Sequence, residues 1–370
     1  MTGKGPVGVG IIGAGVISGT YIENLKSFAD TELLAISDLC PEIAAAKAAE
    51  YGVALHGGND VVLNHPDVEL VINLTPPAVH TEVLGTAIAA GKHVWSEKPL
   101  GLNRESGKAL LEAAEAAGLR VGCAPDTFLG EGLQATKRVL ASGAIGRPLS
   151  ALFLMQQPGP DLWHPNPAFL FQEGAGPLFD IGPYYFTAAV QMFGPVESVA
   201  AVGSKARERR KIHAGPKAGE EFDVTVPSQT TALVRFESGQ VLTLVLSFDS
   251  AVPRILLEVT GTEASLEIPD PNMFDGDIRL RRPGGDDWEP LESTVAKSQR
   301  GTGALDMVRA IREDRPHRAT GALAYHVLDV IGLDRGSVGV RSGRDGGEHR
   351  AAVRGAAGRL GSAGRHRLNH

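Results

Sequence analysis

The sequence has few of the features that mark a secreted, metal-binding or membrane protein. Its only two cysteines, Cys40 and Cys123, provide neither a disulfide framework nor the ligand spacing of a zinc site. No apolar run approaches the roughly 20 residues that a membrane-spanning helix needs. The first apolar stretch begins at Val7, which leaves no room for the charged region and cleavage site of a signal peptide. These absences predict a cytoplasmic protein without a metal centre.

Basic residues are scarce outside the C-terminal end of the chain. The formal net charge is −7, yet residues 332–370 contain eight arginines and only three acidic residues. The rest of the chain is therefore more acidic than the total indicates, and such a body repels the phosphates of nucleic acids. Glycine and arginine make up 18 of these last 39 residues, which predicts either a disordered basic tail or residues read out of frame.

The length of 370 residues exceeds what one hydrophobic core usually fills, so two domains are expected. In residues 5–122, short apolar runs alternate with Ala-rich amphipathic stretches. The runs predict strands at Val7–Ile12, Leu33–Ile36, Leu70–Leu74, His93–Trp95 and Arg120–Cys123. The stretches predict helices at Val16–Ser27, Pro41–Tyr51, Pro77–Ala90 and Arg104–Ala117. Continuous apolar strands separated by helices indicate a doubly wound α/β domain with a parallel sheet, the Rossmann arrangement.

Residues 123–331 follow a different pattern, with longer strands joined by tight turns. Strands are predicted at Ser150–Met155, Val196–Val202, Thr230–Phe236, Val241–Phe248, Arg254–Thr260 and Ala264–Ile268. Helices are predicted at Gly132–Ser142 and Phe179–Phe193. The turn-like links after Phe236 and Thr260 favour an antiparallel meander. The second domain is therefore expected to be α+β with an open, mainly antiparallel sheet.

A glycine-rich turn, Gly13–Ser18, follows the first predicted strand and opens the first predicted helix. Gly13 permits the tight turn, and Gly15 lets a pyrophosphate approach the backbone at the helix N-terminus. Ser18 stands where the usual fingerprint has its third glycine, and its small side chain still permits close packing of helix and strand. Val16 and Ile17 lie within the turn and are expected to contact the same dinucleotide.

Asp38 ends the second predicted strand, about twenty residues beyond the glycines, where an acidic side chain binds ribose hydroxyls. A carboxylate at this position repels a 2′-phosphate, which favours NAD over NADP. The alternative is that Asp38 only caps the helix beginning at Pro41. Thr75 and Pro76 follow the third predicted strand and are expected to place a loop against the cofactor.

Longer motifs resemble those of the glucose–fructose oxidoreductase/inositol dehydrogenase (Gfo/Idh/MocA) family. They lie at Asn73–His80, at Gly91–Pro99 (GKHVWSEKP) and at Gly174–Tyr184 (GAGPLFDIGPY). The resemblance covers about residues 5–331 and implies a Rossmann domain followed by an open-sheet domain. It further implies sugar-like or cyclitol substrates, homodimers or homotetramers formed through the open sheet, and a cofactor-binding role for His80 and Glu97.

Lys98 is the predicted catalytic centre. It comes directly after a parallel strand, at the edge of the sheet where ligands bind in open α/β folds. An ammonium there stabilises negative charge on an oxygen as hydride leaves or arrives. By the resemblance, Pro99 helps to set the lysine against the nicotinamide. The alternative is a solvated surface lysine.

Asp180 and Tyr184 lie four residues apart, so on a helix they share one face. The resemblance implies an aspartate and a proton-carrying histidine at this spacing, and here the second residue is a tyrosine, as in some family members. A phenol beside an ammonium can still relay a proton, because the cation favours its anionic form. Gly182 and Pro183 predict that a helix begins here.

Three further residues are expected to bind substrate. Asp126 follows the last strand of the first domain and either hydrogen-bonds a hydroxylated ligand or stabilises a turn. Trp163 and His164 lie in a Pro-rich loop and suit stacking and hydrogen bonding to a sugar ring. If Tyr184 only packs in the core, His164 or Tyr185 is the alternative acid or base.

These residues together predict an NAD-dependent oxidoreductase that transfers hydride at a secondary alcohol or ketone of a sugar, sugar derivative or cyclitol. Two other functions stay open. One is a non-catalytic dinucleotide-binding regulator, against which the intact Lys98, Asp180 and Tyr184 argue. The other is a redox-neutral, NAD-dependent enzyme that cleaves glycosides, which stoichiometric NADH formation would distinguish.

Overall fold

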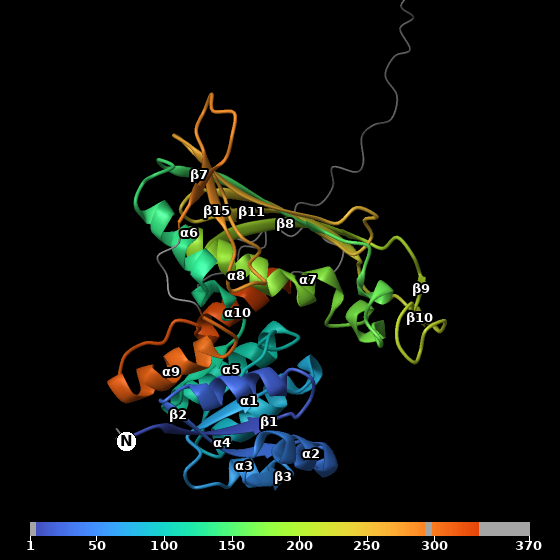
Figure 1. The fold of residues 1–370 in the computed structure, drawn as a ribbon, viewed down its shortest axis with the longest axis vertical. Coiled ribbons are helices and arrows are strands. Elements are labelled where there is room, and N and C mark those ends of the chain that lie inside the picture. Colours follow the sequence, from blue (N-terminus) through green and yellow to red (C-terminus); the bar gives the residue numbers. More distant parts are fainter. Residues whose placement is uncertain (1–4, 293–297, 333–370) are drawn as a thin grey trace, which may run out of the picture.

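The computed structural model describes residues 5–292 and 298–332, which form two sheets with helices between them (Figure 1). Apart from Gly332, the tail predicted at residues 332–370 lies outside the described residues. Among the described helices, none has the length and apolar character needed to cross a bilayer.

The N-terminal sheet is parallel throughout, with the strand order β3-β2-β1-β4-β5-β6. Its strands are β1 (Val7–Ile12), β2 (Thr31–Ser37), β3 (Leu55–Gly57), β4 (Leu70–Asn73), β5 (His93–Ser96) and β6 (Val121–Cys123). The strand order reverses between β1 and β4, and ligands bind open α/β sheets at such a switch point.

The helices of this domain are α1 (Ser18–Ser27), α2 (Pro41–Tyr51), α3 (Asp60–Leu63), α4 (His80–Ala89, after the 3-10 turn η1 at Pro77–Val79) and α5 (Arg104–Ala116). The predicted strands and helices are confirmed with small shifts at their ends. Only β3 and α3 were not predicted, because three or four residues are too few to show a periodic pattern.

The second sheet has eight strands in the order β16-β15-β14-β13-β7-β12-β11-β8. They are β7 (Pro148–Gln156), β8 (Val196–Ser204), β11 (Gln229–Phe236), β12 (Val241–Ser247), β13 (Arg254–Gly261), β14 (Ser265–Glu267), β15 (Ile278–Arg281) and β16 (Glu289–Leu291). A separate two-stranded arm consists of β9 (Arg209–Lys211) and β10 (Glu221–Asp223). Among the sheet's pairs only β7 with β12 is parallel, so the prediction of a mainly antiparallel sheet is confirmed.

The predicted meander is wrong at one connection. Strands β12 and β13 are consecutive in the chain, but β7 lies between them and pairs with both. The link at residues 248–253 is longer than a two-residue hairpin loop, which allows the chain to pass over the end of β7.

Within the described ranges, helices cover one face of this sheet, the face turned toward the N-terminal domain (Figure 1). They are α6 (Glu131–Ala141), α7 (Gly176–Asp180) and α8 (Gly182–Phe193). The sequence predicted one helix over Phe179–Phe193, whereas the chain breaks at Ile181 into α7 and α8. The break follows from Gly182 and Pro183, since proline has no N–H to continue the preceding helix.

The last two helices return to the first domain. Thr320, just before α10 (Gly321–Ile331), forms a bridge with Gly122 of β6, and α10 itself packs against both α5 and α8. Helix α9 (Thr302–Glu313) lies beside the first domain, and α10 lies between the two halves (Figure 1). The division near residue 122 stays a prediction, because these C-terminal helices contact both halves.

Candidate active site

The glycine turn has the form that a dinucleotide needs. Gly13 has a φ of 104°, and a Cβ there would lie 2.7 Å from the carbonyl carbon of Leu74. A Cβ at Gly15 would meet no atom within 4 Å, so this backbone borders open space that a phosphate can enter. Ser18 is fully buried, and its hydroxyl donates to the Gly15 carbonyl at 2.7 Å, consistent with the predicted packing role.

Asp38 connects this turn to the end of β2. Its Oδ2 accepts a hydrogen bond from the Ala14 N–H at 2.8 Å, and its Oδ1 accepts one from the Cys40 N–H at 3.0 Å. The side chain of Cys40, the N-cap residue of α2, makes no capping bond, and Asp38 bonds both the glycine turn and the backbone at the start of α2. The neighbouring apolar side chains Val16 and Leu39 are 100% and 95% exposed, a surface suited to cover by a bound cofactor.

His80 joins the two loops that follow β4 and β5. Its Nδ1 lies 2.7 Å from the Pro99 carbonyl oxygen, and its Nε2 lies 2.8 Å from the Thr75 carbonyl oxygen. Burial lowers the pKa of His80, while the bonds to Pro99 and Thr75 act to raise it. The side chain is almost completely buried. His80 therefore holds the loop after β4 and the loop after β5 together through the carbonyl groups of Thr75 and Pro99.

Glu97 is held from three directions. Its Oε1 accepts from the Tyr21 hydroxyl at 2.8 Å and from Arg300 Nη1 at 3.4 Å, and its Oε2 accepts from the Lys98 N–H at 3.2 Å. The Trp95 indole N–H donates to the Tyr21 oxygen at 3.3 Å. This network fixes the backbone that presents Lys98.

Lys98 and Asp180 form an ion pair across the two domains. Lys98 Nζ donates to both Asp180 Oδ1 and the Asp180 carbonyl oxygen at 2.7 Å. Burial acts to lower the pKa of Lys98, but Asp180 and Tyr184 outweigh it and raise the pKa overall. The ammonium is therefore charged and held in one position, whereas a solvated surface lysine would be charged but free to move.

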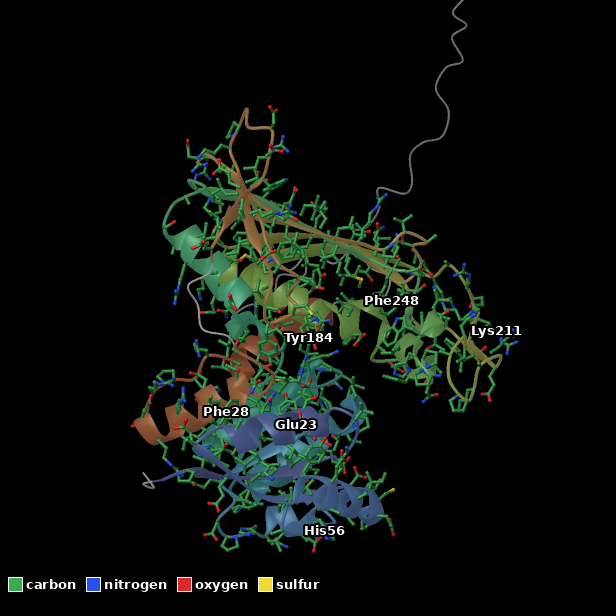
Figure 2. The ribbon with its side chains drawn as sticks, viewed as in Figure 1. Glu23, Phe28, His56, Tyr184, Lys211 and Phe248 are labelled. Atoms are coloured by element: carbon green, nitrogen blue, oxygen red, sulfur yellow. The ribbon has the colours of Figure 1, made fainter. Side chains whose placement is uncertain are left out.

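Tyr184 completes this group. Its ring centre lies 5.4 Å from Lys98 Nζ, and Figure 2 shows the residue where the two halves of the molecule meet. Although Asp180 ends α7 and Tyr184 lies in the first turn of α8, both approach the same ammonium. Burial raises the pKa of Tyr184, whereas Lys98 and Arg300 act to lower it.

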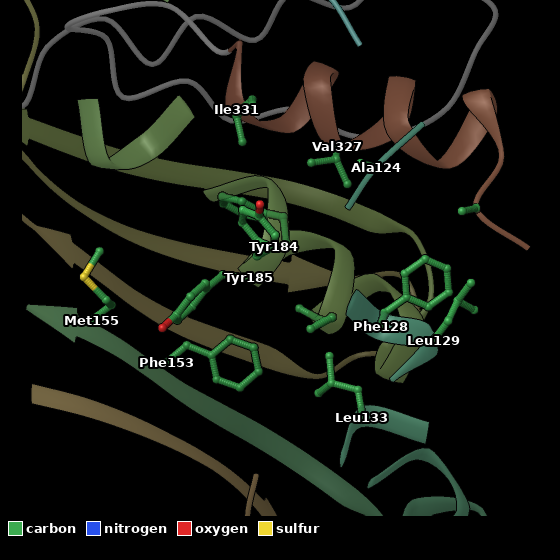
Figure 3. Packing of buried hydrophobic residues seen from close by; sticks show 14 of the residues in the cluster. Ala124, Phe128, Leu129, Leu133, Phe153, Met155, Tyr184, Tyr185, Val327 and Ile331 are labelled. Carbon is green, nitrogen blue, oxygen red and sulfur yellow. The ribbon is translucent and has the colours of Figure 1, made fainter. Parts of the chain in front are cut away.

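Tyr185 points the other way. Figure 3 shows its ring directed toward Phe153 of the sheet and away from Tyr184. The Tyr185 and Phe153 rings meet edge to face with centres 6.2 Å apart. Burial raises the pKa of Tyr185 far above its usual value. This packing favours Tyr184 over Tyr185 as the residue that exchanges protons.

Asp126 is fully buried and binds backbone rather than facing a cleft. Its Oδ2 accepts from the N–H groups of Gly301 and Gly303 at 2.8 and 3.0 Å, at the start of α9. Burial raises the pKa of the Asp126 carboxyl to about 6. Of its two expected roles, this geometry fits the structural one, so Asp126 is left out of the proposed substrate contacts.

Trp163 and His164 lie in the loop after β7. The Trp163 side chain is 62% exposed, and its ring meets the His164 ring edge to face at 5.6 Å. In the described part of the chain, neither ring bonds to or stacks on Lys98, Asp180 or Tyr184. The structure thus does not join this pair to the lysine cluster, and their substrate role stays a prediction.

An ion network that the sequence did not suggest anchors this loop. The side chain of Arg210 in β9 is 2% exposed and donates to Asp161 and Asp249, both at 2.5 Å. Its guanidinium also stacks on Phe171 with 4.7 Å to the ring centre. Asp161 lies two residues before Trp163, so the arm β9–β10 fixes the base of the loop. The sequence gives no signal for Arg210 or Arg300, because the carboxylates that pair with them are distant in the chain.

Known proteins match this chain in both halves. Residues 7–124 match the profile of an oxidoreductase family with an NAD-binding Rossmann fold, and residues 133–267 match the GFO/IDH/MocA C-terminal domain. A 1,5-anhydro-D-fructose reductase of Ensifer adhaerens is 28% identical over 263 residues, which are 70% of this chain and 74% of the reductase. An inositol 2-dehydrogenase of Pseudomonas savastanoi pv. phaseolicola is 33% identical over 147 residues, 38% of this chain and 43% of the dehydrogenase.

Solved structures show the same fold. A levoglucosan dehydrogenase solved with NADH and L-sorbose superimposes with a TM-score of 0.75 at 24% identity, covering 88% of this chain and 95% of its own. An NAD-binding oxidoreductase from Klebsiella pneumoniae gives a TM-score of 0.76 at 23% identity, with coverage of 88% and 95%. The matched profiles span most of both domains, and the chain therefore belongs to the GFO/IDH/MocA family of oxidoreductases.

Proposed function

We propose that this protein transfers hydride reversibly between NAD and a secondary alcohol or ketone of a sugar, sugar derivative or cyclitol. The observation that carries the proposal is the Lys98 ammonium, held by Asp180 and adjoining Tyr184, at the same edge of the parallel sheet as the glycine turn. The named relatives act on anhydrofructose and inositol, which supports a polyhydroxylated substrate.

Each residue of this cluster has a distinct proposed role. When bound, NAD supplies the nicotinamide ring that accepts hydride from the alcohol carbon. Lys98 holds the substrate oxygen and stabilises the charge that develops on it as the C–H bond breaks. Asp180 keeps Lys98 charged and oriented. Tyr184 takes the proton that leaves the alcohol oxygen, and in the reverse direction donates it to the carbonyl oxygen.

The function is tested by incubating the full chain with NAD and a panel of sugars, cyclitols and glycosides while absorbance at 340 nm is followed. We expect stoichiometric NADH formation with at least one polyol. Glycoside cleavage without net NADH would favour the redox-neutral alternative. Tight NAD binding with no reaction on any compound, in either direction, would favour a regulator and contradict the proposal.

Cofactor selectivity is proposed to depend on Asp38. No lysine or arginine occurs in the loop Asp38–Pro41 to pair with a 2′-phosphate, and the carboxylate repels one. The chain should therefore bind NAD more tightly than NADP. Asp38→Ala should weaken NAD binding by about 10- to 100-fold, the equivalent of about 1.5–3 kcal/mol for charge-assisted hydrogen bonds. Titration calorimetry with both cofactors measures the change.

The matched control is Glu42→Ala, which removes a nearby exposed carboxylate from the first turn of α2. This variant should keep the preference of the unaltered protein. Equal affinities for the two cofactors before any substitution, or a preference for NADP, would contradict the assignment of Asp38.

The face of the second sheet that no described helix covers is the proposed surface for self-association. By strand register, one apolar patch spans five strands of this face: Leu152, Leu154, Val202, Leu233, Val241, Val245 and Leu256. Val202 and Leu233 are 66% and 54% exposed in the single chain. Exposed apolar patches of this kind mark protein interfaces, which supports a homodimer or a homotetramer.

Leu233→Glu should shift the protein toward monomer, because it places a charge within the apolar patch that association would bury. Sedimentation velocity over a range of concentrations measures the association state. Leu55→Glu, at an exposed leucine of β3 in the other domain, is the matched control and should leave assembly unchanged. An unaltered protein that is monomeric at micromolar concentration would refute the proposed interface.

A further inference from the structure

Arg300 reaches the cluster from the far end of the chain. It lies two residues before α9, and its Nη1 is 3.4 Å from Glu97 Oε1, with both side chains less than one fifth exposed. The same guanidinium lies near enough to the Tyr184 hydroxyl that its charge and hydrogen bonding act to lower the pKa of the phenol. One side chain thus connects the carboxylate that precedes Lys98 with the phenol that adjoins it.

The backbone that carries Arg300 is fixed on several sides. Asp126 accepts from the N–H groups of Gly301 and Gly303, and the Asn24 side chain donates to the Arg300 carbonyl oxygen at 2.7 Å. A Cβ at Gly303 would lie 2.1 Å from the Trp95 ring, so this segment packs directly on β5. The buried Asp126 therefore fixes the backbone that positions Arg300.

The charges around Tyr184 explain why a second cation is useful. A phenol in water has a pKa of about 10, and burial moves the pKa of Tyr184 further upward. Lys98 opposes this change, but its ammonium is already engaged by Asp180. Burial acts to lower the pKa of Arg300, while Tyr184 and Glu97 raise it, so the guanidinium is always charged.

We propose that Arg300 is a positioning residue of the active site, which holds the Tyr184 hydroxyl and the Glu97 carboxylate and stabilises negative charge on the phenol oxygen. The inference rests on the proposed role of Tyr184 as the proton carrier. By this proposal the segment before α9 contributes a charged side chain to the active site, in addition to packing against β5 and β6.

The test reads the ionisation of Tyr184 directly and needs no turnover. The full chain contains five tyrosines, so 3-fluorotyrosine labelling gives few ¹⁹F signals, and Tyr184→Phe identifies the one from Tyr184. Fluorination also lowers phenol pKa values into a range where the protein can be titrated. The titration midpoint of Tyr184 is compared in the unaltered protein and in Arg300→Met, Arg300→Gln and Arg300→Lys.

Arg300→Met and Arg300→Gln should raise the midpoint by about one pH unit or more, the usual effect of one nearby charge. Arg300→Lys should restore most of the original value. Arg309→Met, on α9 but paired with Asp30 at the surface, is the matched control and should leave the Tyr184 signal unchanged. In kinetic assays, the limb of the pH–rate profile that reports Tyr184 should move upward by the same amount, with NAD affinity nearly unchanged.

An unshifted Tyr184 midpoint in both Arg300→Met and Arg300→Gln, with the signals of Tyr51, Tyr185 and Tyr325 preserved, would overturn the inference. The two proposals fail separately. If the Tyr184 midpoint shifts in a protein that oxidises no substrate, the role of Arg300 is supported and the proposed function is contradicted. If the enzyme is active and the midpoint does not shift, the proposed function is supported and the role of Arg300 is contradicted. If Arg300→Met does not fold, the comparison of Arg300→Gln with Arg300→Lys decides the matter.

Discussion

Replacing Lys98 by alanine should lower kcat by about 10²–10³, the range for loss of one electrostatic stabiliser at an active site. The effect falls mainly on kcat because Lys98 stabilises oxygen charge that is larger in the transition state than in the bound substrate. NAD should still bind, since the glycine turn and Asp38 are unaltered. Steady-state kinetics and a cofactor titration of the same variant measure both quantities.

Lys108→Ala is the matched control for this substitution. Lys108 lies on the exposed side of α5, where it pairs with Glu112 at 3.7 Å, and its removal should leave kcat unchanged. If Lys98→Ala retained full activity with an intact fold, Lys98 would have no catalytic role and hydride transfer at this site would be untenable.

Tyr184→Phe should lower kcat by about 10²–10⁴, a typical contribution of general acid–base catalysis. Because burial raises the pKa of Tyr184, the phenol is protonated near neutral pH and is ready to donate to a ketone. Reduction should therefore proceed at neutral pH and decline as pH rises through this pKa. Oxidation should instead increase with pH. In Tyr184→Phe the corresponding limb of each pH–rate profile should disappear.

Two variants discriminate between the alternatives for this role. Tyr185→Phe should keep the pH–rate profile, since the Tyr185 ring packs against Phe153 of the sheet (Figure 3). His164→Asn should affect the KM for substrate more than the shape of the profile. Full activity in Tyr184→Phe, combined with loss of activity in His164→Asn, would transfer the acid–base role to the loop histidine.

The nucleotide side of the site could be predicted from short local patterns. Gly13, Asp38 and Lys98 each follow a buried strand, and the carboxyl ends of parallel strands meet at one edge of a sheet. Strand order alone then brings these residues together. The glycine turn is also local, because the backbone clash of a Cβ at Gly13 arises from the loop after the neighbouring strand β4.

The substrate side was predicted less completely. The four-residue spacing predicted that Asp180 and Tyr184 share one face of a single helix, but the chain forms two helices there. Only the packing of α7 and α8 shows how both residues approach Lys98. The sequence allowed two roles for Asp126, a hydrogen bond to a ligand or the stabilisation of a turn. The burial of Asp126 and its bond to the Gly301 N–H, just before α9, favour the structural role.

The sequence by itself determined the parallel sheet of the first half, the mainly antiparallel sheet of the second and the glycine turn, since each depends on the periodicity or conformation of neighbouring residues. Only the tertiary structure showed that Arg300 meets Glu97 across 203 positions of sequence, and that Arg210 joins Asp161 and Asp249 in a buried network. Such pairs leave no periodic pattern in the chain. They form because an arginine buried with its charge must find carboxylates and carbonyls wherever the folded chain places them.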